Sequence, residues 1–243
     1  MAEADFLALT NATHNALEGA QISKGAIAAA AVGAPAHSGS NNFVHAFHSL
    51  QDVSGVAGYL YNAVASFNPI VAGKGGSFTI AMRKYTENQY YAPMIAFLFG
   101  TNVATSQAYV LGLSNSAPYQ FVLRKGLLAD GLDPSDASVL RKSDESFSDY
   151  SLWHHLRLDV LINPNNDVRV NVYKNDLDVN DVDAPSWEAV PGMESYIDDA
   201  VGVLSGSVPL TGAKYAFFGH YNEQGAGNVS LLDQMTLGRQ TSP

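Results

Sequence analysis

The feature that most constrains the fold is a succession of short apolar segments that begins at Phe43. These segments are rich in Val, Ile, Tyr, Phe and Leu, and clusters of Gly, Asn, Ser, Pro and Asp separate them. Such a pattern is typical of all-β sandwiches and barrels. No amphipathic helical stretches alternate with the segments, which disfavours a parallel α/β fold. The sequence predicts strands at Phe43 to His48, Gly58 to Tyr61, Ser77 to Tyr85, Met94 to Phe99, Ala108 to Leu113, Tyr119 to Arg124, Leu152 to Ile162, Val168 to Tyr173, Lys214 to Tyr221 and Val229 to Leu237.

The number of these segments favours a two-sheet antiparallel jelly-roll sandwich, because it is too large for one small barrel. With 47% hydrophobic residues, a chain of 243 residues can bury a sizeable core. Two intervals, Asp130 to Ser151 and Asn175 to Gly212, lack regular alternation and are expected to be long surface excursions.

Residues 1–42 differ in composition from the rest of the chain. The first 36 residues hold thirteen alanines and one aromatic residue, Phe6. Apolar and small residues recur at helical spacing from Phe6 to Ala20, with Asp5 as the N-cap and Gly19 as the stop. We therefore predict a partly helical N-terminal arm over residues 1–42 and a β-sandwich over residues 43–243. The arm either packs on its own domain or docks onto a neighbouring subunit.

The charge of the chain excludes two classes of partner. Lys+Arg 13 against Asp+Glu 23 gives a net charge of −10, whereas nucleic acid and anionic membrane surfaces require cations. The absence of cysteine rules out disulfides, a thiolate nucleophile and Cys-ligated zinc. The longest weakly polar run, Ala26 to Ala36, is shorter than the roughly 20 apolar residues of a membrane span. We expect neither a transmembrane segment nor a signal peptide.

The segment from Leu152 to Tyr173 predicts a hairpin with one wet face, because apolar and polar residues alternate along both strands. His154 falls on the apolar side and is interpreted as a hydrogen-bonded core residue, with His155 the more accessible of the two. The wet face combines groups that stack on sugar rings and bond sugar hydroxyls. Packing of that face against another layer or subunit is the favoured alternative explanation. The candidate glycan-binding residues are Trp153, His155, Arg157, Asp159, Arg169, Asn171 and Tyr173.

Three motifs resemble those of laminin-G-like and concanavalin A-like lectin/glucanase domains. The run Trp153-His154-His155-Leu156, with the later Tyr173-Lys174-Asn175, resembles the central hairpin of that family. The segments Ser77 to Arg83 and Phe217 to Arg239 resemble two further strands in the right order. The resemblance implies two antiparallel sheets of six or seven strands each. A short helical arm without signal peptide or cysteine is also similar to tail, fibre or capsid-surface proteins of bacteriophages.

Motifs for catalysis are missing. None of the seven glutamates has a second carboxylate two residues away in a predicted strand, the arrangement typical of glycosidases on this fold. The sequence also lacks a G-x-S-x-G elbow, a phosphate-binding loop and an H-E-x-x-H motif. We therefore expect a protein that is not an enzyme. A lyase on this fold would use Tyr, His and Arg, and His155, Arg157 and Tyr173 could supply these groups.

An acidic run after the hairpin is the candidate ion site. Its oxygen-bearing residues alternate as in the first part of an EF-hand loop, but Asp181 replaces the glycine of position six and Trp187 replaces the glutamate of position twelve. A solvated acidic loop is the favoured interpretation. No cofactor is expected, and if calcium binds, its candidate ligands are Asp176, Asp178, Asn180 and Asp183.

Three functions follow from these observations. The favoured one is a non-enzymatic structural or surface-decorating virion protein on a capsid or tail, attached through residues 1–42 to copies of itself and to neighbouring virion proteins. The alternative is a carbohydrate-binding module that recognises a cell-surface glycan through the face with Trp153 and Tyr173. The third is a glycoside hydrolase or a polysaccharide lyase.

Overall fold

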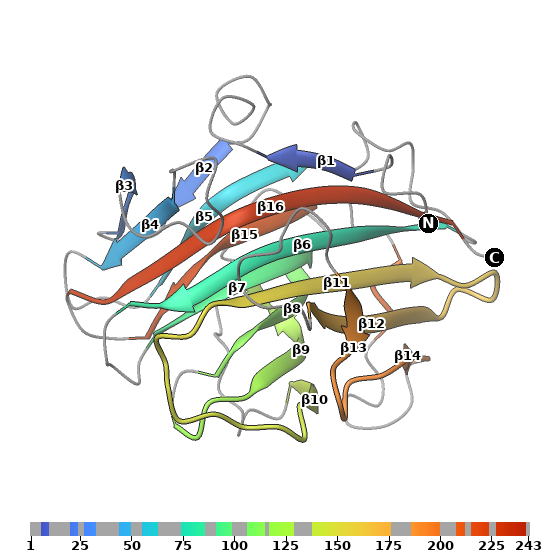
Figure 1. Ribbon diagram of the computed structural model, residues 1–243. Helices are drawn as coiled ribbons and strands as arrows, with labels where there is room; N and C mark the ends of the chain where they lie inside the picture. The colour runs from blue at the N-terminus through green and yellow to red at the C-terminus, as the bar shows by residue number, and fades with distance from the viewer. Residues whose placement is uncertain are drawn as a thin grey trace.

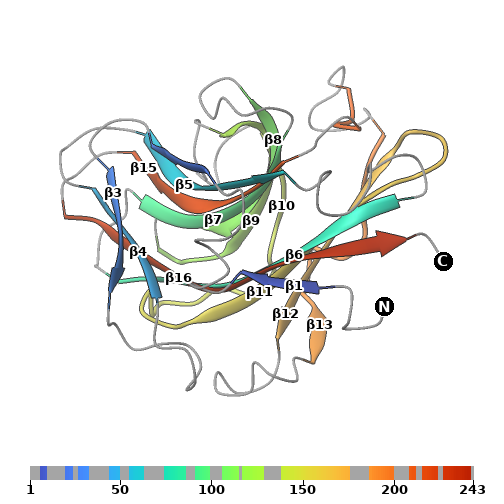
Figure 2. The same cartoon turned by 90° about the horizontal axis from the view of Figure 1, so that it is seen from above.

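The fold consists of two β-sheets packed face to face (Figures 1 and 2). The structure is a computed structural model that describes residues 6–9, 20–23, 27–32, 44–49, 55–62, 74–85, 91–98, 106–114, 117–128, 138–175, 186–199, 208–211, 215–223 and 227–241. Over these ranges, no helix has the length and apolar character needed to cross a membrane. The prediction of an all-β fold with two antiparallel sheets is confirmed.

The larger sheet has nine strands, more than the six or seven that the resemblance implied. β6 lies at its centre and pairs with β11 on one side and with β16 on the other. In sheet order the strands are β13 (Trp187–Ala189), β12 (Val168–Asn175), β11 (His154–Ile162), β6 (Lys74–Lys84), β16 (Val229–Thr241), β4 (Val44–Ser49) and β3 (Ile27–Val32), with β1 (Phe6–Leu9) paired to β16 and β14 (Tyr196–Asp198) paired to β12.

The smaller sheet has seven strands and lies across the core from β6 and β11, as Figure 2 shows. In sheet order the strands are β10 (Val139–Lys142), β9 (Phe121–Leu127), β8 (Gln107–Leu113), β7 (Tyr91–Leu98), β15 (Tyr215–Asn222), β5 (Gly55–Asn62) and β2 (Ala20–Ser23). The short strands β10, β13 and β14 fall within the two intervals that we expected to be irregular.

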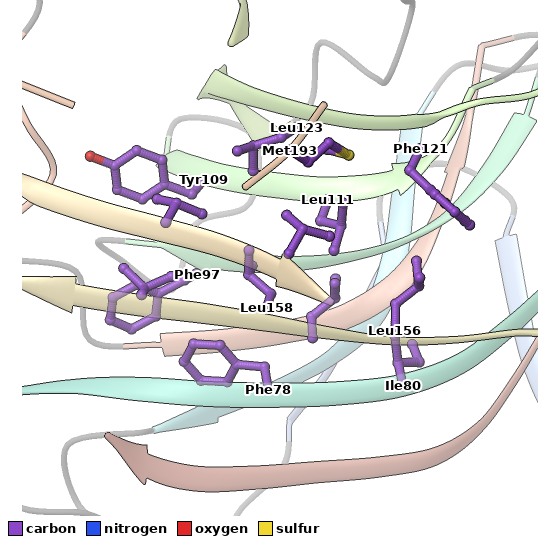
Figure 3. Packing of buried hydrophobic residues seen from close by; sticks show 14 of the residues in the cluster. Phe78, Ile80, Phe97, Tyr109, Leu111, Phe121, Leu123, Leu156, Leu158 and Met193 are labelled. Atoms are coloured by element: carbon purple, nitrogen blue, oxygen red, sulfur yellow. The ribbon is translucent and has the colours of Figure 1, made fainter. Parts of the chain in front are cut away.

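The core lies between the two sheets (Figure 3). Leu156 and Leu158 of β11 are fully buried, as the alternation of the sequence predicted. Across the sheets, the rings of Phe78 (β6) and Phe97 (β7) have their centroids 5.2 Å apart. Burial of each side chain of this size stabilises the fold by about 1.5–3 kcal/mol, so the two sheets are held together mainly by these apolar contacts.

The predicted hairpin is formed by β11 and β12, which pair in antiparallel orientation. Arg157 lies opposite Tyr173, and Asp159 lies opposite Asn171. The connecting turn places Asn166 at φ 68°, in the left-handed region that asparagine tolerates better than most residues. This hairpin supplies most of the residues of the site described below.

The described parts of residues 1–42 are extended and belong to the sandwich. β1 pairs with β16, β2 pairs with β5, and β3 pairs with β4. Residues Phe6–Leu9, which we expected to begin a helix, therefore form a strand that pairs with β16. Residues 10–19, where the rest of the predicted helix falls, lie outside the described residues.

Candidate functional site

Polar and aromatic side chains gather on the outer face of the nine-stranded sheet. Because even-numbered residues of β11 from Leu156 to Ile162 face the core, the odd-numbered ones face outward. We call the central part of this face the outer-face strip. It consists of Ser77 on β6, His155, Arg157 and Asp159 on β11, Asn171, Tyr173 and Asn175 on β12, and Trp187 on β13.

Arg157 is the centre of the strip. Its guanidinium donates two hydrogen bonds to the Asp159 carboxylate, from Nε to Oδ1 at 2.7 Å and from the NH2 nitrogen to Oδ2 at 2.6 Å. Its guanidinium carbon lies 5.3 Å from the ring centroid of Tyr173 and 6.0 Å from that of Trp187. Asp159, which is 1% exposed, also accepts a hydrogen bond from the Ser77 hydroxyl. The Asp159 carboxylate thereby holds the guanidinium within cation–π distance of two aromatic rings.

His155 connects Trp187 to the strip. The two ring centroids are 4.8 Å apart in an edge-on arrangement, and His155 Nδ1 lies 3.4 Å from Asn175 Nδ2. Trp187 takes this position because β13 pairs with β12 so that Trp187 lies opposite Asn175. Trp187 was not among the predicted glycan-binding residues, because nothing in the sequence shows that a three-residue strand pairs with β12.

The predicted glycan-binding residues do not form one compact site. Arg169 lies opposite Leu161, at the far end of the sheet face from Trp153. Trp153 precedes β11, and the Arg83 guanidinium lies 5.7 Å from its ring centroid. Eight residues of strand separate Trp153 from Leu161, which is about 27 Å at 3.4 Å per residue. The structure therefore brings His155, Arg157, Asp159, Asn171 and Tyr173 together and places Trp153 and Arg169 at opposite ends.

A pocket of about 140 Å³ lies where His155 and Asn175 end the strip, on the side of Trp153. We call it the end pocket. Its lining comes from β9, from the turn region 145–147, and from the paired ends of β11 and β12. The lining residues are Phe121, Glu145, Phe147, Trp153, His154, His155, Leu156, Lys174 and Asn175. Two of them, His155 and Asn175, also belong to the outer-face strip, whereas His154, Leu156 and Lys174 occupy core-facing positions of the same strands.

An ion pair forms one wall of the end pocket. Lys174 Nζ donates to Glu145 Oε2 at 2.8 Å, while Glu145 Oε1 is buried and none of the described residues hydrogen-bonds to it. The sequence analysis missed both residues. Lys174 occupied a core-facing position in the alternation from Val168 to Val172, and a lysine at such a position was the available signal. Glu145 carried no signal, because it lies in an interval without regular structure.

His154 forms the opposite, aromatic side of the pocket. Its ring centroid lies 4.4 Å from that of Phe147 and 5.2 Å from that of Phe121. Burial lowers the pKa of His154 to about 4, so the ring is neutral at neutral pH. Its Nε2 atom is buried and has no hydrogen-bond partner within the described part of the chain. The interpretation of His154 as a hydrogen-bonded core residue does not hold for this atom.

The relative exposure of the two histidines was also predicted wrongly. His155 is buried at 8% exposure, whereas His154 keeps an intermediate exposure. Trp187 accounts for part of the burial of His155, since it packs edge-on against that ring. Alternation assigns a side chain to a face of the sheet but does not show which neighbouring strand covers that face.

The calcium hypothesis concerns residues outside the described part of the chain. Asp176, Asp178, Asn180 and Asp183 all fall in the interval 176–185, about which the structure gives no description. Within the described ranges, no three His, Asp or Glu side chains are grouped so that they could hold a metal ion. The four ligands stay a prediction from the sequence.

No protein-family model and no curated protein matches this chain. Among solved structures, it is similar to the endo-β-1,4-glucuronan lyase of the fungus Trichoderma reesei, with 9% identity, a TM-score of 0.57 and coverage of 96% of this chain and 94% of that chain. It is also similar to a carbohydrate esterase of the Shiga toxin-encoding bacteriophage phi24B (13% identity, TM-score 0.46, 92% and 90% covered). A third similar structure is the carbohydrate recognition domain of Emp47p, with 13% identity, a TM-score of 0.43 and coverage of 90% of this chain and 90% of that chain.

The likeness to the glucuronan lyase bears on two of our expectations. The two-sheet antiparallel β-sandwich is confirmed as the fold. The expectation that the protein is not an enzyme is corrected, because the glucuronan lyase is an enzyme that shares the fold over nearly the whole chain. The expectation rested on missing carboxylate pairs, and those pairs are a requirement of glycoside hydrolysis rather than of the fold. The virion location and virion partners stay predictions from the sequence.

Proposed function

We propose that the protein binds a polysaccharide chain across the outer-face strip. The observation that carries this proposal is the position of the Arg157 guanidinium close to the rings of both Tyr173 and Trp187, where Asp159 holds it by two hydrogen bonds. Sugar rings present apolar C–H faces that pack on aromatic rings, and hydroxyls that accept from and donate to planar polar groups. Because the Asp159 carboxylate already orders the guanidinium, little side-chain entropy is lost when a sugar binds.

Affinity electrophoresis and titration calorimetry with a panel of neutral and uronate polysaccharides test this proposal. Tyr173→Ala and Trp187→Ala each remove one aromatic ring and should weaken binding by about 0.5–1.5 kcal/mol, which is roughly 2- to 12-fold. Val208→Ala is the control, because Val208 is a 75% exposed apolar side chain that does not belong to the strip. Unchanged binding by both aromatic variants would refute the proposal.

A second candidate function is cleavage of the bound chain by β-elimination at a uronate residue. This reaction needs a base that removes the proton next to the carboxyl group, a cation beside the carboxylate, and an acid that protonates the leaving oxygen as its C–O bond breaks. The groups are present in the strip as His155, Arg157 and Tyr173. Burial raises the pKa of Tyr173, so its hydroxyl is protonated at neutral pH and able to act as the acid.

Two substitutions at one position separate binding from cleavage. Tyr173→Phe keeps the ring and removes the hydroxyl, so we expect binding to persist and formation of the unsaturated, ultraviolet-absorbing product to fall by roughly 100-fold or more. Tyr173→Ala should reduce both. A Tyr173→Phe variant that releases product at the wild-type rate would rule out Tyr173 as the acid, and wild-type protein that releases none from uronate polysaccharides would rule out the lyase activity.

A further inference from the structure

We propose that the end pocket binds a single uncharged sugar residue, held by Glu145 and His154. Two buried polar atoms in this pocket, Glu145 Oε1 and His154 Nε2, have no hydrogen-bond partner among the residues that the structure describes. Buried polar atoms in folded proteins are nearly always hydrogen-bonded, so two such atoms in one pocket call for a polar occupant. The inference deepens the proposed polysaccharide binding and rests on it for the identity of the ligand as a sugar.

The donor and acceptor pattern of the pocket selects a hydroxyl group. Glu145 Oε1 can only accept, whereas neutral His154 Nε2 donates or accepts according to its tautomer. A hydroxyl group satisfies both atoms, because it carries one donor and two acceptor lone pairs. Neighbouring hydroxyls on one ring can therefore bond to both side chains at once.

The charges of the pocket disfavour an ionic ligand. The Glu145 carboxylate would repel a uronate or a phosphate, and the Lys174 ammonium, 2.8 Å from Glu145, would repel an amine. The ion pair compensates its own charge and leaves the pocket close to neutral. An uncharged residue is thus preferred here, in contrast to the uronate that the lyase candidate requires at Arg157.

The walls and the size of the pocket fit one sugar ring. Phe147, Phe121 and Trp153 line it and offer aromatic surface to the C–H face of a sugar. Its volume of about 140 Å³ is roughly ten times what a single water molecule needs. It is also below the roughly 300 Å³ at which sites for larger ligands begin. His155 and Asn175 belong to both the strip and the lining of the pocket, so the two sites adjoin at these residues.

The two tryptophans of the chain make the pocket and the strip separately observable. Trp153 lines the pocket and Trp187 lies on the strip. In the variant Trp187→Phe, Trp153 is the sole tryptophan. We expect its fluorescence to change on titration with glucose, galactose, mannose or xylose and to respond at least tenfold more weakly to glucuronate.

Two pocket substitutions in the Trp187→Phe background complete the test. Glu145→Gln keeps the shape of the side chain and removes the charged acceptor, and His154→Phe fills the same aromatic space without a nitrogen. Each should weaken the response to the best monosaccharide about tenfold or more. Glu194→Gln, a change at an exposed glutamate outside the pocket, should leave it unchanged. Thermal unfolding of each variant shows whether it is folded.

Three results would overturn the inference. These are no Trp153 response to any of the four neutral sugars, a stronger response to glucuronate than to the neutral sugars, and unchanged binding in a folded Glu145→Gln variant. The complementary variant Trp153→Phe, which leaves Trp187 as the sole tryptophan, reports polysaccharide binding on the strip. If Trp187 responds to polysaccharides while Trp153 does not respond to monosaccharides, the pocket inference fails and the proposed function stands. A Trp153 response to monosaccharides without a Trp187 response to polysaccharides would instead support the pocket and refute polysaccharide binding on the strip.

Discussion

His154 should make the protein sensitive to mild acid, and the substitution His154→Phe should remove most of that sensitivity. The His154 ring is enclosed between Phe121 and Phe147 at centroid distances of 5.2 and 4.4 Å. Burial is the main cause that lowers its pKa from 6.5 to about 4; the positive charge of Lys174 adds to this effect, and the negative charge of Asp149 opposes it. Protonation of His154 therefore favours the unfolded chain.

The size of the effect follows from the two pKa values. Between pH 6.5 and pH 4 the unfolded state binds more protons than the folded state, so stability falls as the pH is lowered through this range. Below about pH 4 His154 is protonated in both the folded and the unfolded state, so its contribution to the free energy of unfolding no longer changes with pH. A difference of about 2.5 pKa units corresponds to roughly 3 kcal/mol, which is an upper limit because His154 keeps some exposure to solvent.

Urea unfolding of the wild type and His154→Phe at intervals from pH 7 to pH 4 measures this effect. The other titrating groups contribute similarly to both proteins, so the difference between the two curves isolates His154. From pH 7 to pH 4, we expect the free energy of unfolding to fall by up to about 3 kcal/mol more for the wild type than for the variant. Parallel curves, or an imidazole NMR titration of His154 with a midpoint near 6.5, would refute the reasoning and with it the neutral state of His154 in the end pocket.

Three further substitutions probe buried groups. Asp198→Ala leaves the buried Lys125 ammonium without the carboxylate that lies 2.5 Å away, which should cost about 3–5 kcal/mol in urea unfolding. Burial lowers the pKa of Lys84 to about 7, so wild-type stability should rise between pH 7 and pH 10.5, and Lys84→Met should abolish that rise in melting temperature. Gly75→Ala places a Cβ 2.0 Å from the Val160 carbonyl oxygen and should lower the melting temperature by several degrees or prevent folding, whereas Ser77→Ala should not prevent it.

The strand predictions succeeded where alternation is long. β6, β11 and β12 each place an apolar residue in the core at every second position, as Phe78, Ile80 and Met82 do on β6, and this period of two is visible in the sequence. The short strands β10, β13 and β14 were missed, because three or four residues are too few to show a period. They form through pairing with a longer strand that is already in place, as β13 does with β12.

The candidate site was predicted in part for the same reason. His155, Arg157, Asp159, Asn171 and Tyr173 were assigned to one face because they alternate with core residues on adjacent strands of a hairpin. Trp187 and Glu145 come from segments distant in sequence, and their contacts with His155 and Lys174 depend on how those segments fold back onto the sheet.

The sequence by itself determined the all-β class, the central hairpin and the face on which its polar residues lie, because each of these follows from local alternation and turn residues. Tertiary structure alone decided which rings enclose Arg157, that Glu145 and His154 share one pocket, and that His154 is neutral. These properties depend on burial and on distances between residues far apart in the chain, since both desolvation and hydrogen bonding are set by the neighbours that the fold supplies.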